Sequence, residues 1–233
     1  TYKTWKDKKA MASAISELLR FTKELFPKGE KSIYIPPSNV LSKEGREVLR
    51  EKFPEIKSIA SNYFPGKFTY SQEFEVADDG MIEQPRIVSG ASWDAYSKLT
   101  VFSELNMHYV TTHFLHPDDV LDEDRGAKLG WPKLYKDFQN EIESLYKVVP
   151  NIRRLTGSEM AGAVQRYAIL TINQNRTDTG LELELGNFHN QAYVMIRLNE
   201  GEPGKVKGGK LEHLTGNLYL LEATSAKVSI EVK

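Results

Sequence analysis

The sequence contains no cysteine, and this absence removes several kinds of site at once. Disulfide scaffolds, thiol nucleophiles and cysteine-ligated zinc sites all need a sulfur atom that this chain does not have. The 31 Lys and Arg residues are balanced by 32 Asp and Glu residues, so the formal net charge is -1. Because nucleic-acid binding depends on an excess of basic side chains, we predict no nucleic-acid partner.

Long apolar runs are also missing. No segment approaches the roughly 20 consecutive apolar residues that cross a bilayer, so we predict no transmembrane segment. The chain starts with Thr1-Tyr2-Lys3 and shows no signal peptide, so we expect a processed product or a part of a longer protein. The lack of cysteine is compatible with export, and we expect an extracellular or cell-surface location.

Helix-like and strand-like segments alternate over residues 1–167. Apolar residues at helical spacing predict a helix from Met11 to Phe26, and Ser42 is a plausible N-cap for a second helix. Residues 31–35 and 56–61 read as short buried strands between the helices. This alternation favours βαβ units and a largely parallel sheet.

A long helix is predicted after Pro132, which suits the first helical position. We assign seven residues at helical spacing to its buried face: Leu134, Tyr135, Phe138, Ile142, Leu145, Tyr146 and Val149. Thr156-Gly-Ser-Glu159 matches a capping box and predicts a shorter helix after it.

The pattern changes near Ala168, after which short strands alternate with turn residues. Val228-Ser-Ile-Glu-Val232, for example, alternates apolar and polar residues as a half-buried antiparallel strand does. Residues 168–233 are therefore expected to form a small antiparallel β-sandwich-like module, separate from the α/β region of residues 1–167.

The densest cluster of chemically active side chains is the segment 107–119, which holds three of the five histidines. It follows an apolar run where we predict that a parallel strand leaves the sheet, and active sites of α/β folds form at that edge. His113 and His116 have opposite parity along a strand, so a regular strand would turn only one of them inward. We favour His116 over His113 as the catalytic residue, because Asp118 and Asp119 can orient its ring or bind a metal with it. The same segment is equally typical of a capped turn with Asp118 as the N-cap.

Two other segments carry candidate substrate-binding residues. The first ends a predicted strand on the same edge as His116, and its candidates are Tyr34, Pro37, Ser38 and Asn39. The second is a Gly/Ser-rich loop in which Trp93 and Tyr96 could stack on the face of a sugar ring. An ordinary strand-to-helix turn and packing beneath a loop are the respective structural alternatives.

Three segments resemble an uncharacterised bacterial family that is distantly related to polysaccharide deacetylases with the NodB homology domain. They are Tyr34-Ile-Pro-Pro-Ser-Asn-Val-Leu-Ser-Lys-Glu-Gly, Phe53-Pro-Glu-Ile-Lys-Ser-Ile59 and His113-Phe-Leu-His-Pro-Asp-Asp-Val-Leu-Asp. The resemblance covers about residues 10–167. It implies part of a distorted (β/α) barrel of deacetylase type, followed by the β module.

The resemblance also implies a metal-dependent hydrolase that removes acetyl groups from an N-acetylated polysaccharide. Tyr34 to Pro37 would match a Pro-containing strand end of such enzymes, and His116, or alternatively His113, would match their general acid. The early Asp-Asp pair and the His-x-x-x-His pair of the family are missing, so we expect the ligands of a divalent metal, most plausibly zinc, to lie mostly outside this chain. The missing N-terminal segment or a second chain would then complete the barrel.

The alternative is a non-catalytic protein that binds polysaccharide or assists its assembly, on a degenerate deacetylase fold. In that case Trp93 and Tyr96 would matter more than the histidines. The sequence does not identify the sugar or its linkage.

Overall fold

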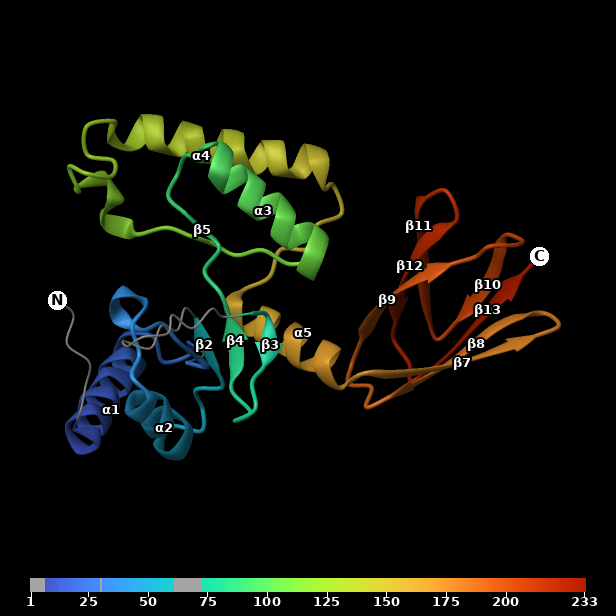
Figure 1. Ribbon diagram of the computed structural model, residues 1–233, viewed down its shortest axis with the longest axis horizontal. Helices are drawn as coiled ribbons and strands as arrows, with labels where there is room; N and C mark the ends of the chain where they lie inside the picture. The colour runs from blue at the N-terminus through green and yellow to red at the C-terminus, as the bar shows by residue number, and fades with distance from the viewer. Residues whose placement is uncertain (1–6, 30, 61–72) are drawn as a thin grey trace. The chain divides into compact units, whose positions relative to one another are not determined.

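The computed structural model describes residues 7–29, 31–60 and 73–233, apart from the side chain of Ser38. The chain divides into two compact units, one ending at Ala161 and the other running over Gly162–Lys233. The division lies close to the boundary at residue 167 that the sequence indicates. Figure 1 shows the helices gathered in the first part of the chain and long strands in the last part.

Two helices cover a small sheet in the first unit. Helix α1 (Lys8–Leu25) begins at Asp7, whose carboxylate accepts hydrogen bonds from the backbone of Lys9 and Ala10. Helix α2 (Lys43–Lys52) begins at Ser42, the N-cap that the sequence predicts. The helices and the sheet share a core of nine buried apolar residues: Met11, Ile15, Leu41, Val48, Leu49, Phe53, Ile56, Ile59 and Met81.

The sheet beneath these helices has four short strands in the order β1-β2-β4-β3. They are β1 (Ile33–Tyr34), β2 (Ser58–Ala60), β3 (Glu75–Val76) and β4 (Ile82–Gln84). The pairs β1–β2 and β2–β4 are parallel, whereas β3 pairs antiparallel with β4. The expected part of a (β/α) barrel is therefore wrong. Closure needs a continuous series of tilted strands, and this sheet is open, with strands of two or three residues and an antiparallel edge.

A second core forms around helices α3 (Ala95–His108) and α4 (Gly130–Val148). β5 (Val88–Ser89), which precedes α3, pairs in parallel with β6 (His113–Phe114), which follows α3, as a separate two-stranded sheet. The buried residues of this core are Val88, Trp93, Val101 and Leu145. Short 3-10 turns follow β1 and β6, namely η1 (Pro37–Asn39) and η2 (Pro117–Val120).

Helix α5 (Gly157–Ile169) begins with the capping box that the sequence predicts. Glu159 accepts a hydrogen bond from the backbone N–H of Thr156 at 2.7 Å, and the Thr156 hydroxyl accepts one from the backbone N–H of Glu159 at 3.3 Å.

The second unit consists of antiparallel strands in two sheets that share one apolar core. One sheet has the order β10-β13-β8-β7 and the other the order β11-β12-β9. Their bounds are β7 (Thr171–Thr177), β8 (Gly180–Gly186), β9 (Ala192–Arg197), β10 (Pro203–Lys207), β11 (Gly209–Thr215), β12 (Leu218–Ala223) and β13 (Lys227–Val232). No helix in the described part of the chain is long and apolar enough to cross a membrane.

Candidate functional site

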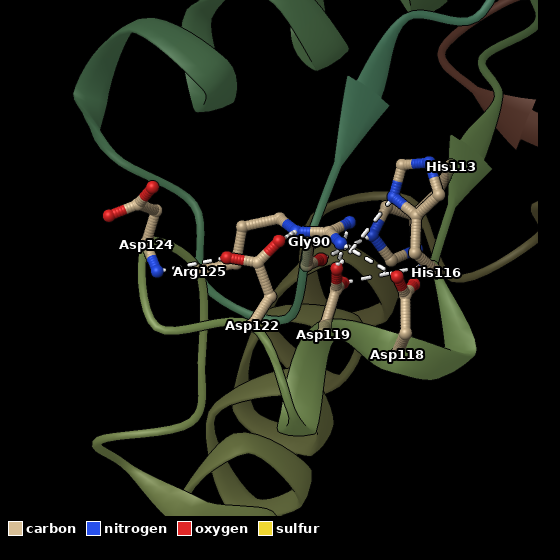
Figure 2. Close-up of polar contacts among 8 residues, drawn as sticks. All are labelled: Gly90, His113, His116, Asp118, Asp119, Asp122, Asp124 and Arg125. Carbon is tan, nitrogen blue, oxygen red and sulfur yellow. Dashed lines mark hydrogen bonds and ion pairs between the residues drawn. The ribbon is translucent and has the colours of Figure 1, made fainter.

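His113 lies in β6 and is held on three sides. Its Nε2 donates a hydrogen bond to the backbone carbonyl of Gly90 at 2.6 Å, as Figure 2 shows. Its ring stacks on Phe138 at 5.3 Å between centroids and meets the ring of Trp93 edge-on, also at 5.3 Å. Burial lowers the pKa of His113, and the Gly90 hydrogen bond opposes this only in part. The structure thus places His113 as a neutral ring between two other rings.

His116 is more open than His113. It follows β6 and precedes η2, and its side chain is 45% exposed. Its Nδ1 lies 3.7 Å from Oδ1 of Asp119, and its ring meets that of Phe114 edge-on at 5.4 Å. The backbone N–H of His116 also donates to Asp119 at 3.4 Å. The structure therefore brings together the imidazole and one of the two carboxylates that the sequence selects.

Arg125 forms ion pairs with the carboxylates of this turn (Figure 2). Its Nη1 lies 2.6 Å from Asp119, its Nη2 lies 3.0 Å from Asp118, and its Nε lies 2.9 Å from Asp122. The hydrogen bonds from Arg125 and from the backbone of Asp124 lower the pKa of Asp122, the backbone bond being the larger cause. Sequence reasoning missed Arg125, although an arginine that follows four aspartates within seven positions is a readable signal.

The cluster of His116, Asp118 and Asp119 does not fit a zinc site. Both aspartates are paired with Arg125, and only one of them approaches the imidazole. Across the described ranges, no group of three or more His, Asp or Glu side chains is arranged to hold a metal ion. The expectation that most ligands of a divalent metal lie outside this chain stays a prediction.

The turn after β1 is held mainly by its own packing. Tyr34 is half-buried against the core of α1 and α2, and this burial raises the pKa of its hydroxyl. Pro37 is exposed, and Asn39 adopts a left-handed backbone conformation with φ of 60°. The side chain of Ser38 lies outside what the structure describes.

Arg86 connects this turn with the histidine segment. Its Nη1 donates to Oδ1 of Asn39 at 2.7 Å, and its guanidinium carbon lies 3.4 Å from the ring centroid of Phe114. Phe114 in turn meets His116 edge-on. A continuous series of contacts therefore joins Asn39 to His116, as the sequence argument requires of residues on one edge, but an arginine that this argument did not select makes the connection.

The two aromatic residues of the Gly/Ser-rich loop have different environments. Trp93 is 6% exposed and belongs to the core, whereas Tyr96 on α3 is 75% exposed. Trp93 is buried edge-on against His113 and is not accessible to a sugar ring, so only Tyr96 of the two is open to solvent.

An open groove of approximately 420 Å³ runs along α4. Its lining residues lie three or four positions apart on one face of the helix: Tyr135, Phe138, Gln139, Ile142, Glu143 and Tyr146. At a rise of 1.5 Å per residue, this face is about 16 Å long from Tyr135 to Tyr146.

The groove corrects the predicted buried face of α4. Leu134 and Leu145 are buried as predicted, at 7% and 6% exposure, but Tyr135 is 46% exposed. The helix therefore has two apolar faces, of which one packs into the core and the other remains open. Apolar periodicity in the sequence does not distinguish the buried face from the open face, because neighbouring faces of a helix share the same 3.6-residue repeat.

Contacts within the unit hold the groove residues in place. Gln139 donates to the Tyr135 hydroxyl at 3.2 Å, and the ring of Trp131 lies 5.4 Å from that of Tyr135. At the other end, the guanidinium of Arg154 lies 4.6 Å from the centre of the Tyr146 ring. The floor is supported by the stacking of Phe138 on His113.

Comparison with protein-family models matched residues 1–220 to DUF2194, described as an uncharacterised protein conserved in bacteria. Comparisons with curated proteins and with solved structures found no match. The family match supports a bacterial protein family but gives no support to a relationship with deacetylases.

Proposed function

We propose that this chain, which belongs to the bacterial family DUF2194, is a polysaccharide-binding unit that holds its glycan in the groove along α4. The observation that carries the proposal is the open row of aromatic and polar side chains from Tyr135 to Tyr146. The proposal concerns binding and needs no catalytic group within the groove.

The groove residues can contact both the apolar face and the hydroxyl groups of a sugar ring. A pyranose has an apolar face of C–H groups and an edge of hydroxyl groups. Tyr135 and Tyr146 offer flat rings that also carry a hydroxyl, and such amphipathic rings suit a surface that is partly wet. Gln139 and Glu143 provide an amide and a carboxylate that can bond to sugar hydroxyls.

The fixed position of these rings favours binding. A side chain that is already held by neighbours loses less conformational entropy when a ligand binds. Tyr135 is held by Gln139 and Trp131, and Tyr146 is held by Arg154. The binding face is therefore partly preorganised.

Charge narrows the class of glycan. Glu143 is the one charged residue among those that line the groove, and it is negative. The Glu143 carboxylate would repel a polyanionic glycan, and the Arg154 guanidinium at the Tyr146 end would repel a polycationic one, whereas a neutral polymer is repelled by neither. We therefore favour a neutral polysaccharide, with N-acetylated sugars as the first class to test.

Affinity electrophoresis of the full chain in gels that contain glycol chitin, a soluble N-acetylated polysaccharide, tests this proposal. We expect retardation of the unaltered chain and a loss of about tenfold in affinity for Tyr135→Ala and for Tyr146→Ala, because a lost stacking contact is worth roughly 1–1.5 kcal/mol.

Tyr167→Ala is the matched control, since Tyr167 is 80% exposed on α5 and lies outside the groove. Tyr96→Ala tests the loop that the sequence selects. Retardation that is abolished by Tyr96→Ala and unchanged by the two groove variants would contradict the proposal.

A second candidate is deacetylation of an N-acetylated polysaccharide, with His116 as the acid that protonates the leaving amine. The exposed imidazole beside Asp119 favours it, because a carboxylate near Nδ1 orients such a ring. Acetate release from glycol chitin, measured with added zinc and with a chelator, tests it. We expect His116→Ala to abolish release and Tyr167→Ala to leave it unchanged. Equal release by His116→Ala and the unaltered chain would exclude His116 from the reaction.

A further inference from the structure

Strand β7 is an open sheet edge of unusual character. It forms the outer strand of the sheet β10-β13-β8-β7, and each of its seven residues is exposed. No other strand at a sheet edge in the described part of the chain is exposed throughout.

The opposite edge of the sheet, β10, carries Pro203, Lys205 and Lys207 and an irregular register with β13. Proline, lysine and bulges are devices that prevent sheets from pairing edge to edge. β7 lacks proline and lysine and pairs with β8 in unbroken register.

The register shows which backbone groups of β7 are free. Leu185 of β8 donates its N–H to Ala226, on the side of β13, so Leu185 does not bond to β7. Antiparallel strands alternate between bonded and non-bonded pairs, so the β7 residue opposite Leu185, which is Ile172, points its N–H and C=O away from β8. By the same alternation, the backbone groups of Gln174 and Arg176 also point outward. Outside the strand ladders, no backbone hydrogen bond joins these three residues to another described residue.

We propose that β7 pairs with β7 of a second copy of this chain, antiparallel and about a two-fold axis at Gln174. The sequence of β7 is nearly symmetric about that residue. The facing pairs would be Thr171 with Thr177, Ile172 with Arg176, Asn173 with Asn175, and Gln174 with its own copy. The three outward-facing residues of each copy then meet each other, and about six backbone hydrogen bonds form across the axis.

Side-chain charge favours this arrangement. The one charged residue of β7 is Arg176, and it faces Ile172 rather than another arginine. On the outer face, Glu182 and Glu184 of β8 lie beside Asn175 and Asn173, respectively. In the dimer, two asparagine side chains separate the glutamates of one copy from those of the other. At about 4.8 Å per strand, that separation is roughly 14 Å, beyond the distance at which exposed charges interact in physiological salt. A contact along one strand is small, so we expect weak association.

Sedimentation velocity over micromolar to millimolar concentrations tests the proposal on the full chain. We expect the mean mass to rise from monomer toward dimer as concentration increases. Gln174→Pro removes an outward N–H that the fold itself does not use, so we expect a folded monomer at all concentrations. Gln174→Thr keeps that N–H and should associate as the unaltered chain does. Gln174→Lys places like charges at the axis and should also be monomeric, which provides a second test if the proline variant does not fold.

The absence of cysteine allows a geometric test as well. In a bonded antiparallel pair the Cα atoms are about 5.5 Å apart, within the range that a disulfide spans. We expect Gln174→Cys to form a disulfide-linked dimer under mild oxidation much faster than Asn217→Cys, which places the thiol in an exposed turn. A chain that stays monomeric at millimolar concentration, with equal cross-linking of the two cysteine variants, would overturn the proposal.

Discussion

Two arginines of the first unit each form ion pairs with several carboxylates, but one arginine is buried and the other is largely solvated. Arg46 is bidentate to Asp79, at 2.6 and 2.7 Å, and reaches Glu83 at 2.5 Å. Its side chain is 11% exposed, and Glu83 is fully buried. Arg125 reaches three aspartates over similar distances, but its side chain is 35% exposed.

This difference in burial separates an ion-pair network that stabilises the fold from one that solvent can rearrange. Burial alone would lower the pKa of Arg46, but the hydrogen bonds that it donates to Asp79 and Glu83 outweigh this effect and raise the pKa. A buried carboxylate that loses its partner cannot recover its hydration, so this network holds α2 to the sheet. Water and salt compete with the contacts of Arg125, so the histidine turn can rearrange at low cost.

The largest expected effect is that of Arg46→Ala. It leaves the carboxylate of Glu83 buried without its arginine, and we expect a loss of about 3–5 kcal/mol in the free energy of unfolding. Urea denaturation measures this loss. Arg125→Ala is the control within the same unit, and an equal loss in the two variants would remove the distinction between the clusters.

A smaller effect separates the two histidines of the turn. His113→Ala removes a partly buried hydrogen bond to Gly90 and the stacking on Phe138, and we expect a loss of about 1–3 kcal/mol in the free energy of unfolding. His116→Ala removes an exposed ring and should cost no more than about 0.5 kcal/mol. Thermal and urea unfolding of the two variants provide the comparison. Equal costs would mean that His113 is not part of the packed core.

Stability should depend on pH through His113. Its folded-state pKa lies below the unfolded value of about 6.5, so the unfolded chain binds the proton more readily. The stabilisation from His113 is therefore complete above that pH and decreases as the pH falls below it. Urea unfolding between pH 7.5 and 5 should show a shallower decline for His113→Gln than for His116→Gln. Parallel curves for these two variants and the unaltered chain would contradict the assignment.

The smallest expected effect is that of Arg125→Ala on thermal stability. We expect a slight decrease in Tm in dilute buffer that shrinks further in high salt, because the ion pairs of Arg125 are solvated and screened. The decrease caused by Arg46→Ala should persist in high salt. Differential scanning calorimetry at two salt concentrations measures both. A salt-independent effect at Arg125 would show that its cluster is more deeply buried than the structure indicates.

Helix starts and strand alternation could be predicted from the sequence, because they depend on side chains that are close in the chain. The N-cap at Ser42 and the capping box from Thr156 to Glu159 lie where predicted, because a short polar side chain beside the first free N–H groups suffices to start a helix. Strand β13 (Lys227–Val232) agrees with the alternation seen at its residues. Such features need no information about distant contacts.

Tertiary arrangement did not follow in the same way. Residues 99–108, interpreted as part of an apolar run toward a strand, lie in α3, and the strand itself is only His113–Phe114. A short apolar run fits a buried helix or a strand equally well, and only contacts elsewhere decide between them. The barrel that the family resemblance implied was wrong because the first sheet is open, with strands of two or three residues and an antiparallel edge.

The candidate site was anticipated only in part. The proximity of His116 and Asp119 agrees with the sequence argument, since these residues are close in the chain. Arg86 and the open face of α4 were missed, because the first acts through the distant Asn39 and the second could not be distinguished from the buried face by spacing.

Glycan binding in the α4 groove is tested most directly by an NMR titration of the labelled chain with an N-acetylated chito-oligosaccharide. We predict that the largest backbone shift changes lie between Trp131 and Tyr146 on α4, and that they vanish in the double variant Tyr135→Ala/Tyr146→Ala. Changes confined to the strands of the second unit or to residues 93–96, or the same changes in the double variant, would contradict it.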